Sequence, residues 1–215
     1  MENMSYSNSS IKTYEQCPFK YKLTRIEHRQ EPTGDAATRG KAIHSEFEDL
    51  LKDGLPLYTE ATAHWETYVN DLKAKGAKSE VELGFTKDWE VCGFSESIVW
   101  LRGIIDILVI DHTTAYVADW KTGKERDYEE QLKLYAVMIF AAYPEVTKVD
   151  MEIIYTDLKK KVKYTAIERK DFEALKLWVD NRISRIERDD IYAPKPSFGC
   201  RWCHFRKDNG GPCRW

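Results

Sequence analysis

Residues 101–135, LRGIIDILVIDHTTAYVADWKTGKERDYEEQLKLY, decide the fold of this 215-residue chain. Residues 103–111 and 114–120 are apolar runs rich in β-branched residues that predict consecutive strands, and a helix-forming segment follows them. Each strand carries an acidic residue where an apolar one is expected, Asp106 in the first and Asp119 in the second. Burying a carboxylate without a partner is costly. The two residues therefore indicate a metal site or a mutual interaction.

Composition bounds the class of protein. Hydrophobic residues make up 42% of the chain and charged residues 32%, which is typical of one folded domain with a full core. The net charge is −3, so an attraction for nucleic acid has to come from a local basic surface. The sequence contains no apolar stretch of about 18 residues and begins without an apolar signal core. We therefore expect a cytoplasmic protein that does not enter a membrane.

The flanking sequence predicts further helices and strands. Helices are expected, after a short one near Ile11, at residues 38–51, 58–75, 128–142 and 170–189. Strands are expected at residues 81–85, 89–94, 98–101, 149–155 and 161–167, the last two forming a hairpin. This order predicts an α/β fold in which helices flank a mixed central β-sheet.

The acidic pair has the chemistry of a divalent metal site. If the two strands are neighbours, the carboxylates of Asp106 and Asp119 reach one point at the sheet edge, and such hard oxygen ligands suit Mg²⁺ or Mn²⁺. Asp119 and Lys121 are two residues apart and share a face of a regular strand. A metal and an ammonium group placed there could offset charge that builds on a phosphate. His44 could add a nitrogen ligand, which favours Mn²⁺.

Each of these residues also has an ordinary structural interpretation. A short Asp-x-Lys pattern is usually a solvated strand end, and Asp106 could form a salt bridge with Lys121 or Arg102. His44 could be an ordinary helix histidine. Gln131 and Tyr135, one helical turn apart, could be a surface residue and a core residue. The functional interpretation depends on the combination of these motifs in order.

The ordered motifs Gly40-x-x-x-His44, Gly103-x-x-Asp106, Asp119-Trp120-Lys121 and Gln131-x-x-x-Tyr135 resemble the RecB-type branch of the PD-(D/E)XK nuclease superfamily. The resemblance implies a restriction-endonuclease-like core and a metal-dependent DNA nuclease. It also implies that the metal is held by His44, Asp106, Asp119 and the carbonyl group of Trp120. Lys121 would position water or stabilise the transition state, and Gln131 and Tyr135 would support the site or touch DNA. Ile105 stands where the superfamily motif often has proline.

The cysteines suggest a second metal site. Cys200-x-x-Cys203 has metal-binding spacing, Cys213 follows, and Cys17 would be the fourth thiolate, while Cys92 is expected to be a small buried residue. Four thiolates can hold zinc or a 4Fe–4S cluster.

The sequence resembles the iron–sulphur CRISPR-associated and AddB-type exonucleases, in which one cysteine precedes the core and three follow it, and this favours 4Fe–4S. The gap between Cys203 and Cys213 is longer than in that pattern. His204 could replace Cys213 as the last ligand, but its position next to Cys203 makes it awkward. The alternative to a metal site is a set of reduced, unliganded thiols. We expect one nuclease domain over residues 1–215, in which residues 1–28 and 190–215 form a cysteine-ligated element around a catalytic core at residues 36–189.

Basic residues indicate where DNA phosphates could bind. They are Lys124, Arg126, Lys159, Lys160, Lys161, Lys163, Arg201, Arg206 and Lys207. Those near the last cysteines alternate with Trp202 and Phe205, and basic groups beside exposed aromatic rings suit single-stranded DNA. The alternative is a solvated charge run, with the rings packed around a metal knuckle.

The favoured function is a metal-dependent exonuclease acting on single-stranded DNA ends, with 5′ to 3′ polarity taken from the resemblance alone. It would serve recombination, repair, or phage or CRISPR-type DNA processing in a bacterial, archaeal or phage-infected cell, with protein partners of those pathways or as an oligomer. One alternative is an iron–sulphur DNA-binding partner with little or no cleavage activity. Another is a structural metal-knuckle protein that binds no nucleic acid.

Overall fold

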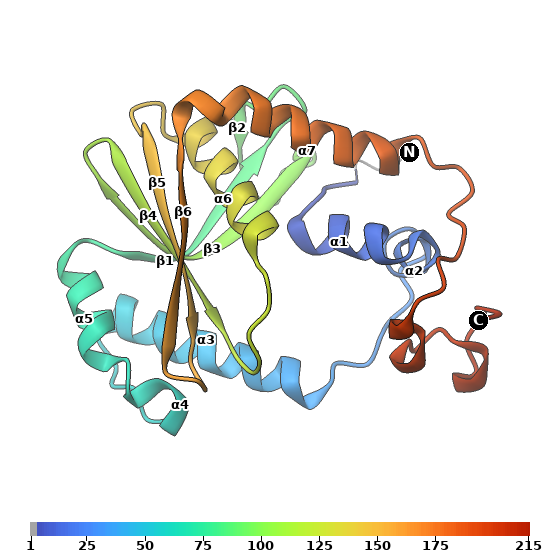
Figure 1. Ribbon diagram of the computed structural model, residues 1–215, viewed down its shortest axis with the longest axis horizontal. Helices are drawn as coiled ribbons and strands as arrows, with labels where there is room; N and C mark the ends of the chain where they lie inside the picture. The colour runs from blue at the N-terminus through green and yellow to red at the C-terminus, as the bar shows by residue number, and fades with distance from the viewer. Residues whose placement is uncertain (1–3) are drawn as a thin grey trace. The chain divides into compact units, whose positions relative to one another are not determined.

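The computed structural model describes residues 4–215 and divides the chain into two compact units (Figure 1). The core unit contains Asp35–Leu177, and the terminal unit combines Tyr6–Gly34 with Trp178–Trp215. The boundary between them falls within one helix, α7 (Phe172–Glu187). No helix among the described residues is long and apolar enough to cross a membrane.

The core unit is built on the predicted mixed sheet. Its six strands lie in the order β2-β1-β3-β4-β5-β6. Their bounds are β1 Lys78–Phe85, β2 Val91–Cys92, β3 Leu101–Asp111, β4 Thr114–Lys121, β5 Lys148–Tyr155 and β6 Lys160–Glu168. β4 and β5 are parallel, and every other neighbouring pair is antiparallel. Figure 1 shows β3 and β4, which carry Asp106 and Asp119, in the middle of the sheet.

One face of the sheet is covered by α3 (Asp35–Asp53), α4 (Glu60–Ala63) and α5 (Glu66–Ala74) (Figure 1). The apolar stripe of α3 packs on alternate residues of the central strands, among them Ala118 and Trp120 of β4. The Phe47 and Trp120 rings stack with centroids 3.7 Å apart, a contact worth about 0.5–1.5 kcal/mol beyond the area it buries. This packing holds α3 against the end of β4.

The opposite face carries α6 (Glu129–Ala142). This helix, which the sequence predicts at residues 128–142, is buried on almost all sides. It lies close to β3, because a Cβ atom at Gly103 would be 2.9 Å from Met138 Cε. Since side chains alternate along a strand, Asp119 points away from the α3 face that Ala118 and Trp120 occupy. The sheet therefore directs Asp119 toward α6.

Three element predictions differ from the structure. Residues 58–75 form α4 and α5 rather than one helix, because the chain turns at His64–Trp65 and buries Trp65. Only Val91–Cys92 of the strand predicted at residues 89–94 is extended, and Trp89 has a φ of 63°. β3 begins at Leu101, so residues 98–100 precede the strand. Cys92 is half-buried rather than buried.

The terminal unit joins two segments that are far apart in the sequence. Its elements are α1 (Asn8–Gln16), α2 (Pro18–Tyr21), a π-helical turn (Lys22–Ile26), the second part of α7, and short 3₁₀ turns at Phe198–Trp202 and Lys207–Asn209. Ser7 caps α1 through a reciprocal capping box with Ser10.

Contacts of α1 and α2 with the later segment hold the terminal unit together. Arg182 donates two hydrogen bonds to Glu15, at 2.7 and 2.6 Å. Tyr14 donates to Asp189 at 2.8 Å. The Tyr21 and Tyr192 rings are stacked, with centroids 6.2 Å apart. Bidentate geometry and ring packing stabilise a pairing between two segments that no local pattern could have predicted.

Candidate active site

Asp106 lies where two central strands separate. The antiparallel ladder of β3 and β4 extends as far as the pair Ile107 and Ala118. The backbone N–H of Trp120 donates to Asp106 Oδ2 at 2.8 Å, so the carboxylate takes the place of a ladder partner. Burial raises the pKa of Asp106, and the nearby Asp119 carboxylate raises it further. Proton binding or cation binding at Asp106 therefore relieves an unfavourable buried charge.

His44 is brought to the same point by α3. Its Nε2 lies 3.0 Å from the carbonyl oxygen of Trp120, and its Nδ1 lies 3.3 Å from Asp106 Oδ2. Burial lowers the pKa of His44, but the carboxylates of Glu80, Asp106 and Asp119 outweigh burial, and the pKa is raised overall. The raised pKa favours the doubly protonated imidazole, whose two ring nitrogens both face oxygen atoms.

Glu80 of β1 completes an acidic group around His44. Its Oε1 lies 3.9 Å from His44 Nδ1. One ligand atom each of His44, Glu80 and Asp106 lies within 4.8 Å of the other two. A surface cavity of about 320 Å³ borders this group and is lined by Ala37, Gly40, Lys41, His44, Ser45, Glu48 and Glu80.

The backbone at Glu80 is unusual. Its φ is 48°, in the left-handed region, while its neighbours Ser79 and Val81 pair normally with Ile107 and Ile105 of β3. Such a conformation costs a non-glycine residue about 1–3 kcal/mol and persists where the surroundings impose it, often at functional sites. In the sequence Glu80 alternates with apolar residues and suggests only a solvent-facing position. No sequence signal identified it as part of the site.

Asp119 is held by α6 and by its own strand. Gln131 Nε2 donates to Asp119 Oδ1 at 2.6 Å, and the Tyr135 hydroxyl donates to the same oxygen at 3.3 Å. Gln131 also donates to the Tyr135 oxygen at 2.7 Å. Burial raises the pKa of Tyr135 well above its usual value, so the hydroxyl remains a donor. These contacts fix the orientation of a carboxylate that is 1% exposed.

Lys121 forms an ion pair with the other Asp119 oxygen, Oδ2. That oxygen accepts no hydrogen bond of ordinary geometry from any residue in the described range 4–215. Burial lowers the pKa of Lys121, but the Asp119 and Asp106 carboxylates outweigh it and raise the pKa overall. The ammonium group is therefore charged and lies 4.9 Å from the centre of the Tyr128 ring.

The donor set fits a divalent cation. Two carboxylates, an imidazole and a backbone carbonyl converge at His44, and the buried Oδ2 of Asp119 lacks an aligned hydrogen bond. Mn²⁺ and Mg²⁺ prefer such ligands. Of the residues predicted to hold the metal, the structure groups His44 and Asp106 with the Trp120 carbonyl. Asp119 lies next to this group but is engaged by Lys121, Gln131 and Tyr135.

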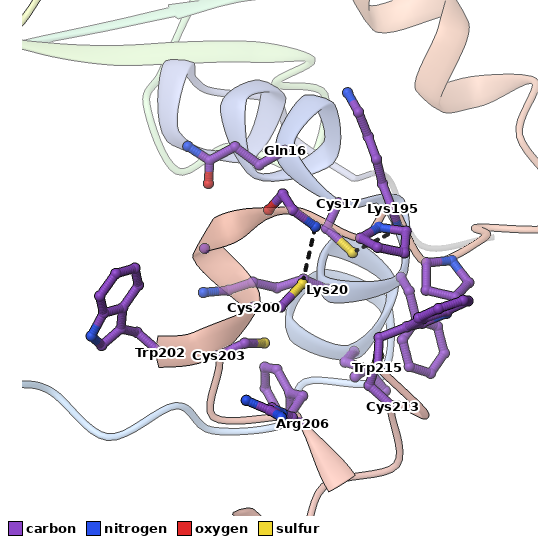
Figure 2. Close-up of a pocket in the computed structure, with 17 residues that line it drawn as sticks. Gln16, Cys17, Lys20, Lys195, Cys200, Trp202, Cys203, Arg206, Cys213 and Trp215 are labelled. Carbon is purple, nitrogen blue, oxygen red and sulfur yellow. Dashed lines mark hydrogen bonds between the residues drawn. The ribbon is translucent and has the colours of Figure 1, made fainter. Parts of the chain in front are cut away.

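The four cysteines of the predicted second site line one cavity of about 360 Å³ in the terminal unit (Figure 2). The backbone N–H of Lys195 donates to Cys17 Sγ at 3.5 Å, and that of Ser197 donates to Cys200 Sγ at 3.3 Å. Within residues 4–215, no three potential metal ligands whose ligand atoms all lie within 4.8 Å of one another include a cysteine. The predicted cysteine ligand set is therefore not assembled in this structure.

Comparison with known proteins agrees with the motifs. Residues 5–207 match the family model of the PD-(D/E)XK nuclease superfamily. A crystal structure named "Putative exonuclease", from Eubacterium rectale, has a TM-score of 0.54 at 13% identity, covering 97% of this chain and 88% of that one. The crystal structure of SSO0001 has a TM-score of 0.49 at 16% identity, covering 95% and 85%. A search of the curated proteins found no match.

The extent of the family match decides the classification. It covers both strands of the acidic pair, the helix with His44 and the helix with Gln131 and Tyr135. At 13% identity the likeness to the Eubacterium rectale structure shows a shared fold. This chain belongs to the PD-(D/E)XK nuclease superfamily.

Proposed function

We propose that this protein is a metal-dependent deoxyribonuclease of the RecB-type branch that hydrolyses phosphodiester bonds. The observation that carries the proposal is the convergence of His44, Glu80 and Asp106 beside the Asp119–Lys121 ion pair, at the place where β3 and β4 separate. Phosphodiester hydrolysis accumulates negative charge on the phosphate, and acidic residues alone would oppose it. A bound divalent ion supplies the Lewis acid that polarises the phosphate.

Each residue of the chain has a defined task in this proposal. His44, Glu80, Asp106 and Asp119, with the Trp120 carbonyl, hold the divalent ion. The Lys121 ammonium, kept charged by Asp119, orients the attacking water or stabilises the charge on the phosphate. Gln131 and Tyr135 touch Asp119 rather than solvent, so they are positioning residues that keep its carboxylate aligned.

An exonuclease acting on single-stranded DNA ends remains the favoured form of this activity. The fold shared with the Eubacterium rectale protein, whose name includes "exonuclease", supports it. The 5′ to 3′ polarity and a place in recombination, repair or CRISPR-type processing depend on the motif resemblance. A protein partner or oligomer from those pathways is part of the same proposal.

We further propose that Cys17, Cys200, Cys203 and Cys213 hold a 4Fe–4S cluster. Two features support this assignment: all four line one cavity, and backbone N–H groups already point at two of the sulfurs. Around a single zinc ion, with Zn–S bonds of about 2.3 Å, four sulfurs lie within about 4 Å of one another. In a cubane cluster each cysteine binds a different iron, so the sulfurs stand further apart than around zinc.

Cleavage of end-labelled DNA tests the nuclease. Anaerobically purified protein is incubated with single-stranded and duplex DNA in Mn²⁺, Mg²⁺ or EDTA. We expect metal-dependent ladders from one end, and a decrease of about 10²–10³-fold or more in Lys121→Ala. Lys75→Ala, which changes an exposed lysine at the C-terminal end of α5, is the control. Absence of cleavage by folded, cluster-loaded protein would instead favour a DNA-binding partner without activity.

A further inference from the structure

The terminal unit differs from the core unit in charge. It contains 13 lysines and arginines against eight aspartates and glutamates, a net charge of +5, although the whole chain carries −3. The remaining residues therefore carry −8. The excess lies mainly in residues 195–215, which hold five basic residues and one acidic residue, Asp208. A nucleic acid backbone is attracted to this segment and repelled by the acidic remainder.

Two large aromatic rings are exposed on the same segment. Phe198 is 69% exposed and Trp202 is 71% exposed, with ring centroids 5.1 Å apart. Figure 2 shows Trp202 projecting away from the cysteine sulfurs. Phe205, between the same cysteines, is 4% exposed and packs inside. Phe205 is thus packed inside, whereas most of the Trp202 ring is open to solvent.

Arg201 lies over the Phe198 ring and adds a charge. Its guanidinium carbon is 4.7 Å from the centre of the Phe198 ring. Within residues 4–215 the structure gives Arg201 no carboxylate partner, so its charge remains available to a phosphate. Aromatic faces with an adjacent guanidinium bind unpaired bases with little sequence preference, because every base has a π-face. A duplex offers no such face along its length, since its bases are already stacked and paired.

We propose that Phe198, Arg201 and Trp202 form a stacking platform that binds the bases of single-stranded DNA on the terminal unit. The proposal rests on the proposed nuclease function, whose substrate it specifies. Phe198 and Trp202 each stack on a base, and Arg201 contacts a phosphate. The basic residues of the segment attract the strand, and the rings select an unpaired region.

Binding to three labelled probes tests the platform. The full-length, cluster-loaded protein carries Lys121→Ala so that the probe is not cleaved, and fluorescence anisotropy is recorded. The probes are an oligothymidylate of about 15 nucleotides, an abasic strand of equal length, and a blunt duplex. We expect Trp202→Ala and Phe198→Ala each to weaken oligothymidylate binding about tenfold and to leave abasic-strand and duplex binding unchanged. Trp202→Phe should restore most of the affinity.

Two controls separate stacking from folding and from charge. Tyr58→Ala removes a ring that is 79% exposed on the core unit and should change nothing. Arg201→Ala should reduce the slope of log affinity against log salt by about 0.7. Because Trp202 lies between two cysteines, iron content and circular dichroism are measured for each variant. If Trp202→Ala loses iron, the DNA affinity of Phe198→Ala decides whether the rings stack on bases.

The platform is wrong if both folded ring variants bind oligothymidylate as tightly as the parent does. It is also wrong if the variants lose as much affinity for the abasic strand as for oligothymidylate. If the protein with Lys121 intact cleaves DNA but the ring substitutions have no effect on binding, the platform alone is wrong. If the parent binds no DNA and cleaves none, the proposed function fails as well. Ring variants that bind DNA normally but lose self-association would assign the surface to a protein contact instead.

Discussion

His44 and Lys121 carry the positive charges that offset the acidic group in the structure. The pKa values of both His44 and Asp106 are raised, His44 by surrounding carboxylates that outweigh its burial and Asp106 by burial and Asp119. Both groups therefore hold protons at pH values where the isolated side chains would lose them. Ligation of a cation requires their deprotonated forms, so metal binding competes with protons.

This competition predicts a pH-dependent metal affinity. Mn²⁺ should bind more tightly as the pH rises through the raised pKa values, with release of protons on binding. Calorimetric titration in buffers of different ionisation enthalpy measures the number of protons released. His44→Ala should release fewer protons and bind Mn²⁺ more weakly. An affinity that does not vary between pH 6 and 9 would contradict this assignment of the ligands.

Glu80 predicts a conflict between stability and function. Glu80→Gly removes the strain of a positive φ, worth about 1–3 kcal/mol, against an entropic cost of about 0.5–1 kcal/mol for glycine in a strand. The free energy of unfolding in EDTA should therefore rise slightly, while Mn²⁺ affinity falls at least tenfold. Glu80→Gln should lose affinity without the gain in stability. Glu82→Gln, an exposed neighbour on the same strand, is the control.

Single residues show what the sequence could predict of the site. Asp106, Asp119 and Lys121 were predicted as a group because charged residues inside apolar strands need partners, and the structure places them together. Glu80 was missed because its role depends on a backbone torsion that neither a glycine nor an asparagine marks.

At the scale of elements, the turn between β5 and β6 is connected to α3 and to the loop after β4. Arg39 of α3 donates to both Asp157 oxygens, at 2.9 and 2.6 Å, and the Gly123 N–H donates to the same carboxylate at 2.9 Å. Asp157 therefore joins three segments that border the acidic site. Sequence patterns placed each segment correctly but contained no information on this connection, which links residues 118 positions apart.

The connection predicts an acid-sensitive stability. Hydrogen bonds from Arg39 lower the pKa of Asp157, outweighing its burial. The Asp157 carboxylate therefore makes its full contribution to the free energy of unfolding above its pKa in the unfolded chain, near 4. This contribution is lost as the pH falls through the lower pKa of the folded state. Asp157→Asn should cost up to about 1 kcal/mol at pH 7, as exposed pairs do, and less at pH 2. Denaturant unfolding at both pH values measures this, with Asp53→Asn as a control expected to be neutral at both.

The turn before Cys213 also depends on one residue. A Cβ atom at Gly211 would lie 2.2 Å from the backbone carbonyl of Phe205, so the two segments approach more closely than any side chain allows. Gly211→Ala should lower the free energy of unfolding by about 1–3 kcal/mol and reduce iron content. Gly199→Ala, whose Cβ would make an ordinary contact, should do neither. Equal iron content in both variants would exclude this turn from the cluster site.

At the scale of the whole chain, the proposed cluster links segments that flank the entire core unit. A cross-link closing a 100-residue loop is worth about 4.7 kcal/mol in chain entropy, and the loop from Cys17 to Cys200 is longer. Cys203→Ser should therefore lose iron and melt at a lower temperature than the parent, whereas Cys92→Ser should keep both properties. A Cys203→Ser variant that melts like the parent contradicts the cross-link.

The division into units marks the limit of sequence-based prediction at this scale. Periodicity located the strands and helices of the core because each pattern is local. The pairing of Glu15 with Arg182 and of Tyr21 with Tyr192 involves residues whose local patterns are ordinary. Only the cysteine spacing suggested that the two ends belong together.

The discontinuous terminal unit also bears on biosynthesis. During translation, Tyr6–Gly34 leaves the ribosome before the core unit, but the partners it needs lie in Trp178–Trp215, which is made after the core unit. Domains generally fold as units while synthesis proceeds, so the nuclease core can form while Tyr14 and Tyr21 still lack the Tyr192 ring. A nascent chain halted after Leu177 would therefore carry the catalytic residues without the basic, cysteine-containing surface that we propose captures DNA.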